Sequence, residues 1–234
     1  MLQDIVSNGS ESLTRMLNLF DLIDDSQNIQ NDSGIAYTIG NRTVEVINSS
    51  IELENAMKTI ERAPFIGFDT EQKPTFKKGQ ASHGVCLIQL ATKSKCYLIQ
   101  NKQIENLKPL IKLLENPRVI KIGTGLKGDN DALFKQFKLR LRSTIDLENV
   151  FKKLSSKNQI GAKKAALIIL NQNLQKSKNM SRSNWENKIL SDGQIKYASE
   201  DATVVYDVMQ TFIEQYPFII DIIPPFFKEH YTKA

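Results

Sequence analysis

A short apolar run that ends in two acids constrains this chain more than any other stretch. Pro64 precedes Phe65-Ile66-Gly67-Phe68, and the run continues into Asp69-Thr70-Glu71. The apolar residues do not alternate with polar ones, which is typical of a strand covered on both faces of a sheet. Residues two apart on a strand point to the same face, so Asp69 and Glu71 lie together at the end of this predicted central strand.

Two carboxylates on one face of a buried strand are costly unless a positive charge lies between them. A divalent metal ion relieves this cost, because Mg²⁺ prefers hard oxygen ligands. The pattern Asp-x-Glu is common, however, and in most proteins it marks a solvated strand end. The choice between these interpretations depends on whether other carboxylates reach the same edge of the sheet.

The chain has the length and composition of one globular domain with tails. It has 234 residues, of which 41% are hydrophobic and 24% are charged. No run of about 18 apolar residues predicts a membrane-spanning helix, and no basic region opens a secretory signal. We therefore expect an intracellular protein, nuclear or cytoplasmic, without a membrane partner. Cys86 and Cys96 lie in apolar runs and are expected to be buried thiols rather than a disulfide or a zinc site.

Charge is distributed unevenly along the sequence. The net charge is +5, yet residues 1–34 carry one base, Arg15, and six acids, Asp4, Glu11, Asp21, Asp24, Asp25 and Asp32. Residues 151–196 carry ten Lys and Arg residues against two acids. This basic segment is either a binding surface for a polyanion or a solvated lysine-rich surface, and charge alone favours neither.

Residues 1–34 are predicted to form an acidic, partly flexible N-terminal extension. They are rich in Asn, Ser and Asp. Ser12 is a candidate N-cap for a helix in this extension, in which apolar residues recur at helical spacing: Leu13, Met16, Leu17, Phe20 and Ile23. The helix either docks on the core of the chain or binds a partner.

The segments between residues 35 and 123 predict a mixed sheet. Residues 35–39 and 43–47 have the pattern of two short strands joined by a Gly40-Asn41 turn. Ser49 and Glu52 form a capping box for a helix to about Arg62. Further strands are expected at 85–90, 96–99 and 119–123, with a helix near 104–114. This order is typical of an α/β sheet with helices on both faces.

Further acids follow two strand-like segments. The glycines of the turn at 123–129 do not have the spacing of a dinucleotide-binding loop, and we reject that interpretation. The turn brings Asp129 near the start of a helix at 130–137, as a third carboxylate at the same edge of the sheet. Asp131 is a rival that equally suits a solvent-facing first turn. Asp146 is either a fourth acid or the cap of a helix at 148–154.

The clearest helix signal lies near the end of the chain. Ser191 and Gln194 form a capping box for a helix that is predicted to run to about Tyr216. Tyr197 and Asp201 are four residues apart on it and share an otherwise small, apolar face. A carboxylate buried there beside a phenol is rarely idle. Trp185, the only tryptophan, is expected to be a packing residue rather than a stacking platform for bases.

Seven residues are candidate contacts to a nucleic acid. The loop after Glu71 either holds a strand by phosphate contacts and one stacking face or is only a polar connection. Its candidates are Lys73, Phe76, Lys77 and Lys78, and the basic segment adds Lys163, Lys164 and Arg182.

Three motifs in this order resemble those of the DEDDy 3′–5′ exonucleases, the superfamily of RNase D and the proofreading exonucleases. They are Phe68–Glu71, Gly125–Leu133 and Tyr197–Ala202. Leu87–Leu90 and Ser183–Trp185 also match the subgroup that contains the Werner syndrome protein's exonuclease domain. The resemblance implies a ribonuclease H-like fold, a mixed sheet of five to six strands flanked by helices. Residues 35–234 are then expected to form the exonuclease domain.

The resemblance also implies a metal-dependent enzyme that removes nucleotides from the 3′ end of DNA or RNA. Two divalent cations, Mg²⁺ or Mn²⁺, would be bound by Asp69, Glu71, Asp129 and Asp201, with Asp69 bridging them. Tyr197 would orient the attacking water.

Asp131 marks a departure from the Werner-type pattern. That position carries an aromatic residue near the substrate in the Werner-type domain, so the substrate preference is not carried over. The alternative is a catalytically inactive scaffold that binds nucleic acid, but the presence of all four acids and Tyr197 favours the enzyme. No helicase-like region occurs in the sequence, so we expect any helicase to be a separate partner chain, bound through residues 1–34.

Overall fold

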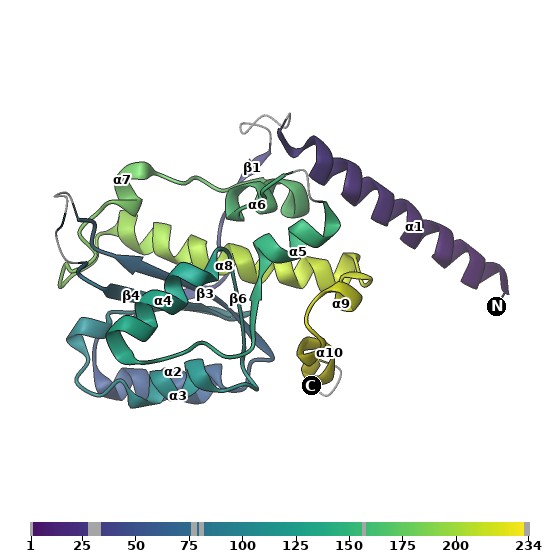
Figure 1. Ribbon diagram of the computed structural model, residues 1–234. Helices are drawn as coiled ribbons and strands as arrows, with labels where there is room; N and C mark the ends of the chain where they lie inside the picture. Colours follow the sequence, from purple (N-terminus) through teal and green to yellow (C-terminus); the bar gives the residue numbers. More distant parts are fainter. Residues whose placement is uncertain (1, 28–33, 76–78, 80–81, 156–157, 232–234) are drawn as a thin grey trace.

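A mixed six-stranded sheet runs through the middle of the molecule in the computed structural model (Figure 1). The structure describes residues 2–27, 34–75, 79, 82–155 and 158–231. The strand order is β2 (Thr43–Ile47), β5 (Lys95–Ile99), β4 (Val85–Ala91), β3 (Phe65–Gln72), β6 (Ile120–Gly123) and β7 (Thr144–Asp146). β4 is antiparallel to both of its neighbours, and the other neighbouring pairs are parallel. The predicted mixed sheet is confirmed.

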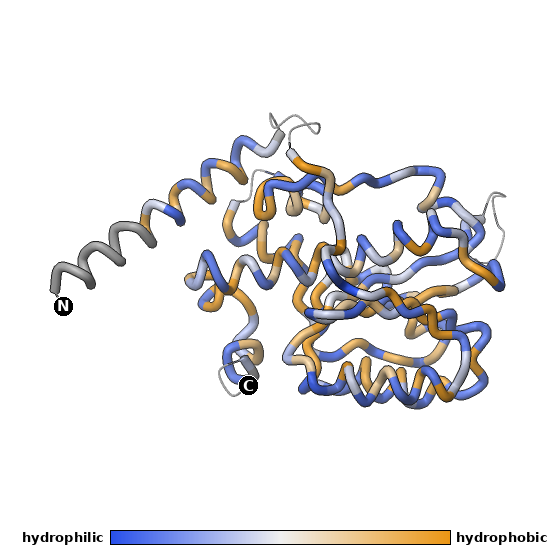
Figure 2. Tube along the Cα trace, turned by 180° about the vertical axis from the view of Figure 1, so that it is seen from behind, coloured by the Kyte–Doolittle hydropathy of each residue, from blue (hydrophilic) through white to orange (hydrophobic). Residues whose placement is uncertain are grey.

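Helices cover both faces of this sheet (Figure 1). One core contains apolar residues of α2 (Ser50–Ile60), α3 (Lys108–Glu115) and α4 (Leu126–Phe137). The other contains those of α5 (Leu147–Leu154), α6 (Ala162–Leu170) and α8 (Asp192–Gln215). Figure 2 shows apolar segments concentrated where the helices meet the sheet. The remaining short elements are η1 (Asp25–Gln27), η2 (Asn101–Gln103), β8 (Gln172–Asn173), α7 (Lys178–Ser181), α9 (Ile219–Ile222) and α10 (Pro225–Tyr231).

The long helix α8 lies directly against the central strand β3. The predicted capping box opens it, because Ser191 Oγ accepts from the Gln194 N–H and the Gln194 side chain accepts from the Ser191 N–H. Gly67 permits the close approach, since a Cβ at this position would lie 1.9 Å from the Ala202 carbonyl oxygen. The helix therefore crosses the strand two residues before Asp69.

Two predictions about residues 1–48 are wrong. The segments 35–39 and 43–47 do not form a hairpin, because β1 (Ile35–Ala36) pairs with β8 and β2 pairs with β5. Gly40 and Asn41 do form a turn, but it joins strands of two different sheets. Ser12 does not cap the first helix, since α1 (Leu2–Asp24) begins ten residues earlier and includes it.

The last turns of α1 dock on the body of the molecule. Leu19 and Ile23 are fully buried. The Asn158 amide donates to the carbonyl oxygens of Ile23 and Asp24, and the Ser155 hydroxyl donates to the Asp24 carboxylate. The first turns of α1 extend away from the sheet (Figure 1). Residues 28–33 of the predicted extension lie outside the described residues.

The expectation of buried cysteine thiols agrees with the structure. Cys86 and Cys96 are buried free thiols. None of the helices in the described ranges combines the length and the hydropathy that a membrane crossing needs.

Lys121 on β6 is fully buried, and its Nζ donates to the backbone carbonyls of Asn116 and Val119 (3.0 and 2.7 Å). Burial lowers its pKa to about 7. The unfolded chain, in which this lysine has an ordinary pKa, therefore binds more protons above pH 7. The unfolding free energy of the wild type should rise with pH relative to that of Lys121→Met, by up to about 1.4 kcal/mol per pH unit.

Chemical denaturation between pH 7 and pH 9 measures this difference. Lys112→Met, which removes an exposed lysine of α3, is the matched control and should run parallel to the wild type. A Lys121→Met profile that is also parallel would contradict the prediction.

Candidate active site

Three elements bring four carboxylates and one phenol to the same region, beside the C-terminal end of the central strand β3. These are Asp69 and Glu71 from β3, Asp129 from α4, and Tyr197 and Asp201 from α8. Asp69 and Glu71 have the same strand parity as Gly67, so they lie on the face of β3 that α8 covers. The Thr70 hydroxyl donates a 2.5 Å hydrogen bond to Asp129 Oδ1 and so joins β3 to α4.

Asp146 fixes the turn that presents Asp129. Its carboxylate accepts from the backbone N–H groups of Gly125 and Leu126, both at 3.1 Å, where α4 begins. Gly125 has a left-handed backbone (φ 67°), which favours glycine at this position. Asp146 also accepts from the Glu148 N–H and caps α5. Its role is therefore the predicted cap, made at two helix starts.

Burial and mutual repulsion make the two acids of β3 difficult to ionise. Burial is the largest cause that raises the pKa of Asp69 to about 8, and repulsion from Asp201 adds to it. Burial likewise raises the pKa of Glu71 to about 9, followed by repulsion from Asp69. Without a cation, these side chains therefore retain protons at neutral pH.

Burial is also the largest cause of the raised pKa values on the two helices. It raises the pKa of Asp201, whereas Lys176 and a hydrogen bond with Tyr197 lower it. Burial, and then Asp201, raises the pKa of Tyr197, so the phenol stays protonated and able to donate. In α4, burial raises the pKa of Asp129, and the Thr70 hydroxyl opposes the shift.

The loop before α8 packs against the phenol. Trp185 is almost fully buried, and its ring centroid lies 6.0 Å from that of Tyr197. The predicted packing role of this tryptophan is confirmed.

Lys176 supplies a positive charge within this group of acids. It lies between β8 and α7, with its Nζ 2.6 Å from Asp201 Oδ1. The same Nζ lies 5.6 Å from the centroid of the Tyr197 ring. Sequence reasoning missed this residue, because nothing local distinguishes it from the other nine bases of the segment 151–196.

The chemistry of the four acids fits a divalent cation, because carboxylates are hard oxygen donors whose mutual repulsion a cation relieves. Within the described ranges, however, no group of three or more His, Cys, Asp or Glu side chains is arranged to hold one metal ion. Asp201 is paired with Lys176 instead. The donor set therefore suits a cation, and the side chains would have to rearrange to surround it.

Asp131 is directed away from the acids that Asp129 joins. Residues two apart on a helix do not face each other. Asp131 is exposed and lines a cavity of about 450 Å³ together with Gln72, His83 and Gln136. The structure thus places Asp129, and not Asp131, beside Thr70 and the acids of β3.

The candidate nucleic-acid contacts have different surroundings. Phe76, Lys77 and Lys78 lie outside the described residues. Lys163 and Lys164 belong to the first turn of α6 and line a cavity of about 470 Å³ together with Lys176. Arg182 is exposed at the end of α7.

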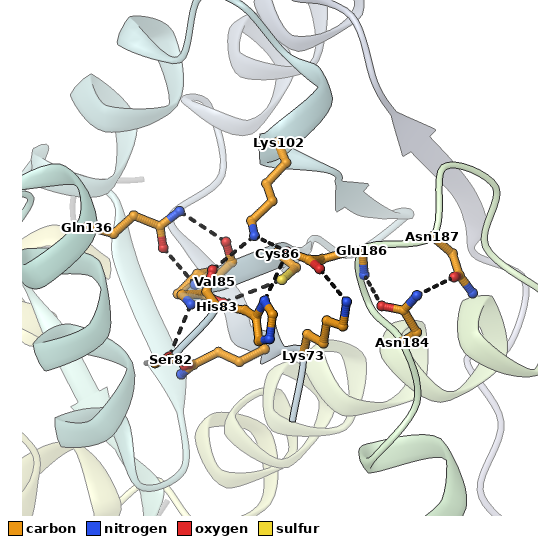
Figure 3. A network of polar contacts seen from close by, with 12 residues as sticks. Lys73, Ser82, His83, Val85, Cys86, Lys102, Gln136, Asn184, Glu186 and Asn187 are labelled. Carbon is orange, nitrogen blue, oxygen red and sulfur yellow. Dashed lines mark hydrogen bonds and ion pairs between the residues drawn. The ribbon is translucent and has the colours of Figure 1, made fainter. Parts of the chain in front are cut away.

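Lys73 belongs to a cluster of four charged or titratable side chains, the Glu186 cluster: Lys73, His83, Lys102 and Glu186 (Figure 3). Lys73 Nζ lies 2.8 Å from Glu186 Oε2, His83 Nδ1 lies 3.6 Å from Oε1, and Lys102 pairs with Oε1. Hydrogen bonds from Lys102 and then Lys73 lower the pKa of Glu186 to about 2. The cluster ties the segment after β3 to the loop before α8, and its members are too far apart in sequence for a motif to reveal it.

A buried amide lies beside Asp69. Gln89 on β4 is directly opposite Asp69 in the antiparallel pair and is fully buried. Neither its Oε1 nor its Nε2 has a hydrogen-bond partner among the residues that the structure describes. Directly opposed residues have Cβ atoms about 5 Å apart, which puts this amide within reach of the Asp69 carboxylate. The sequence signal for this buried amide was a single glutamine in the otherwise apolar segment that forms β4.

Comparison with known proteins points to one family. Residues 44–216 match the family model described as 3′–5′ exonuclease. The chain is 32% identical over 161 residues to the mouse bifunctional 3′–5′ exonuclease/ATP-dependent helicase WRN, a match that covers 68% of this chain and 11% of that protein. Among the first three relatives, the match spans between 11% and 49% of the relative's length.

Solved structures share the fold. Escherichia coli RNase D superposes with a TM-score of 0.68 at 19% identity, over 80% of this chain and 48% of that chain. Trypanosoma brucei RNase D in complex with RNA U12 superposes with a TM-score of 0.67 at 17% identity, over 75% of this chain and 64% of that chain. The mixed sheet flanked by helices is thus of the ribonuclease H-like class.

Replacing Gln89 with methionine should raise the unfolding free energy of the metal-free protein by about 1–3 kcal/mol. The reason is that the substitution removes an unpaired buried amide and keeps a similar volume. Chemical denaturation in EDTA measures the change.

Gln100→Met is the matched control, because Gln100 is also buried but donates to the Asn187 carbonyl oxygen at 2.8 Å. It should lower the unfolding free energy. If both variants were destabilised alike, the Gln89 amide would have to be satisfied in the folded protein.

Proposed function

The chain belongs to the 3′–5′ exonuclease family, and from this we propose that it removes nucleotides from the 3′ end of DNA or RNA. A water oxygen attacks the phosphorus of the terminal phosphodiester, and the bond to the 3′-oxygen breaks. The products are a nucleoside 5′-monophosphate and a new 3′-hydroxyl. The observation that carries the proposal is the convergence of β3, α4 and α8, which gathers four carboxylates and a protonated phenol in one buried region.

In this proposal Asp69, Glu71, Asp129 and Asp201 would hold two divalent cations, Mg²⁺ or Mn²⁺. When bound, the cations supply charge stabilisation to the attacking and leaving oxygens of an in-line displacement. Support comes from the raised pKa values of the acids, because a bound cation would stabilise their ionised forms at neutral pH. Thr70 holds Asp129 in place through its hydroxyl.

Tyr197 orients the attacking water. Its phenol is a hydrogen-bond donor at neutral pH, because burial and Asp201 keep it protonated. The phenol donates its one O–H to the Asp201 carboxylate, so the water would donate to the phenol oxygen, and Trp185 packs against the ring.

The incoming strand follows the basic side of the site. Lys163 and Lys164 open α6 beside the cavity that Lys176 also lines, and their charges suit phosphate groups. Arg182, exposed at the end of α7, is proposed as a further contact. Phe76, Lys77 and Lys78 are proposed as contacts on the sequence pattern alone. Lys73 contributes less to binding the phosphates of the strand, because it is already paired with Glu186.

Residues 1–34 bind a separate protein, such as a helicase chain, in the same proposal. Leu13 and Leu17 lie one turn apart on α1 and remain 53% and 52% exposed, although the end of this helix is docked. The acidic composition of the segment suits a basic partner surface.

An inactive scaffold that binds nucleic acid is the second candidate. A degenerate member of the family would be expected to lose acids, whereas the four acids and Tyr197 are all present and close together. Retained binding without product on any substrate would favour the scaffold.

Asp69→Ala and Asp201→Ala should each lower the rate of 3′-end cleavage by about a thousandfold or more. A bound cation contributes several kcal/mol of charge stabilisation, and each 1.4 kcal/mol is about tenfold in rate. The assay follows 5′-labelled single-stranded DNA, recessed duplex DNA and RNA on gels, with Mg²⁺, Mn²⁺ or EDTA. Glu54→Ala is the matched control, because it removes an exposed acid from α2, which packs on the other face of the sheet. Wild-type rates in either of the first two variants would remove that acid from the mechanism.

The double substitution Lys163→Ala/Lys164→Ala should weaken binding to a single-stranded oligonucleotide. It should also reduce the slope of log affinity against log salt by about 1.4, since each single-strand phosphate contact contributes about 0.7. Fluorescence anisotropy at several salt concentrations gives the slope. Lys108→Ala/Lys112→Ala removes the same charge from α3, which packs on the other face of the sheet, and should leave the slope unchanged.

A further inference from the structure

Lys176 forms an ion pair that is buried on one side only. The Asp201 carboxylate in this pair is 2% exposed, while the lysine side chain is 33% exposed. The acid thus has almost no access to water, whereas the lysine approaches it from the surface. An ionised acid in this position needs a nearby cation, and Lys176 is the cation at hydrogen-bond distance.

The backbone that carries Lys176 is fixed on both sides. Leu174, two residues before it, is buried in the core. Ser177, immediately after it, caps α7 through a hydrogen bond from the Met180 N–H to its Oγ. Movement is therefore left to the side chain, a flexible four-carbon arm that ends in a compact charge.

A second environment for this ammonium lies next to the first. Lys176 lines the cavity of about 470 Å³ that Lys163, Lys164 and Gly161 also line. This cavity gathers three lysines and one acid, Glu148, so it suits an anion such as a phosphate group. The Lys176 ammonium thus contacts the buried Asp201 carboxylate and also borders the lysine-lined cavity.

The first position is incompatible with a divalent cation on the same oxygen. A cation bound to Asp201 Oδ1 would stand within a few ångströms of the ammonium, and like charges at that distance repel strongly in a partly buried site. The lysine and the metal ion therefore compete for one carboxylate.

We propose that Lys176 is a mobile internal counter-ion, which holds Asp201 in the metal-free protein and, when a divalent cation binds there, moves into the lysine-lined cavity and contacts a phosphate of the nucleic acid. The inference rests on the proposed function, because it assumes that Asp201 binds metal and that a strand enters this cavity. It makes one side chain a link between cation binding and strand binding.

The first test is Mn²⁺ affinity, measured from the signal of free Mn²⁺ by electron paramagnetic resonance. Lys176→Met removes the competitor and should bind Mn²⁺ about tenfold more tightly. Lys176→Arg should bind it more weakly than the wild type, because a guanidinium pairs with a carboxylate through two hydrogen bonds. Unchanged or weaker Mn²⁺ binding by Lys176→Met would overturn the proposal. Should that variant fold poorly, the opposite shift expected of Lys176→Arg decides the question.

The second test separates a mobile lysine from a fixed phosphate contact. Binding of a fluorescent oligonucleotide with a 3′-terminal phosphorothioate is measured in Mn²⁺ and in EDTA. Lys176→Met should weaken binding by about fivefold in Mn²⁺ and leave it unchanged in EDTA, where the wild-type lysine is held by Asp201. An equal loss in both conditions would overturn the displacement.

Lys178→Met is the matched control, since it removes an exposed lysine two residues away and should leave Mn²⁺ affinity unchanged. Cleavage by the wild-type chain is scored separately on gels. Cleavage without the Mn²⁺-dependent difference would overturn only the inference about Lys176. No Mn²⁺ binding by the wild type would overturn both that inference and the metal-dependent function.

Discussion

The burial of neighbouring carboxylates, with the repulsion between them, is the constraint to which the rest of this structure responds. Asp69 is affected by both Asp201 and Asp129, and Glu71 by Asp69 and Asp201, in a region where burial removes most of the stabilisation by water. Such an arrangement persists only if rigid elements force the acids together. Here a central strand, a long capped helix and a helix start fixed by Asp146 do so. The stability of the scaffold thus offsets the cost of the site.

The lysines near these acids form ion pairs with particular carboxylates. Lys176 pairs with Asp201, whereas Lys73 and Lys102 pair with Glu186. The first pair neutralises an acid of the site itself, and the second holds two chain segments beside it. Lys73 and Lys102 are therefore less available to a polyanion, and α6 is where two lysines face an open cavity.

Much of the fold could be predicted because its signals are local. The apolar run of β3, and the capping boxes at Ser49 and Ser191, depend on residues within a few positions of one another. The hairpin prediction at 35–47 failed because β1 and β2 pair with strands distant in sequence, and no local pattern says which strand pairs with which. The start of α1 was missed because the polar stretch at residues 7–12 interrupts the apolar spacing, which resumes only at Leu13.

The candidate site also has residues with local sequence signals and residues without them. Its five principal residues lie in short motifs, so the sequence pattern could single them out. Lys176, Glu186 and Gln89 act across elements, through an ion pair, a cluster and a cross-strand position that depend on the folded arrangement. Lys73 was predicted as a nucleic-acid contact, and its partner, 113 residues away, could not be foreseen.

The missing side chain at Gly67 has a consequence for how this site can change. Tyr197 and Asp201 are both carried by α8. The distance of this helix from Asp69 is set by the close contact between the Ala202 carbonyl oxygen and the backbone of β3 at Gly67. Even one methyl group at residue 67 would act as a spacer and lift both side chains away from the strand together. The alignment of the candidate catalytic side chains is therefore set by a position that carries no chemistry of its own, and it is sensitive there to the smallest possible enlargement.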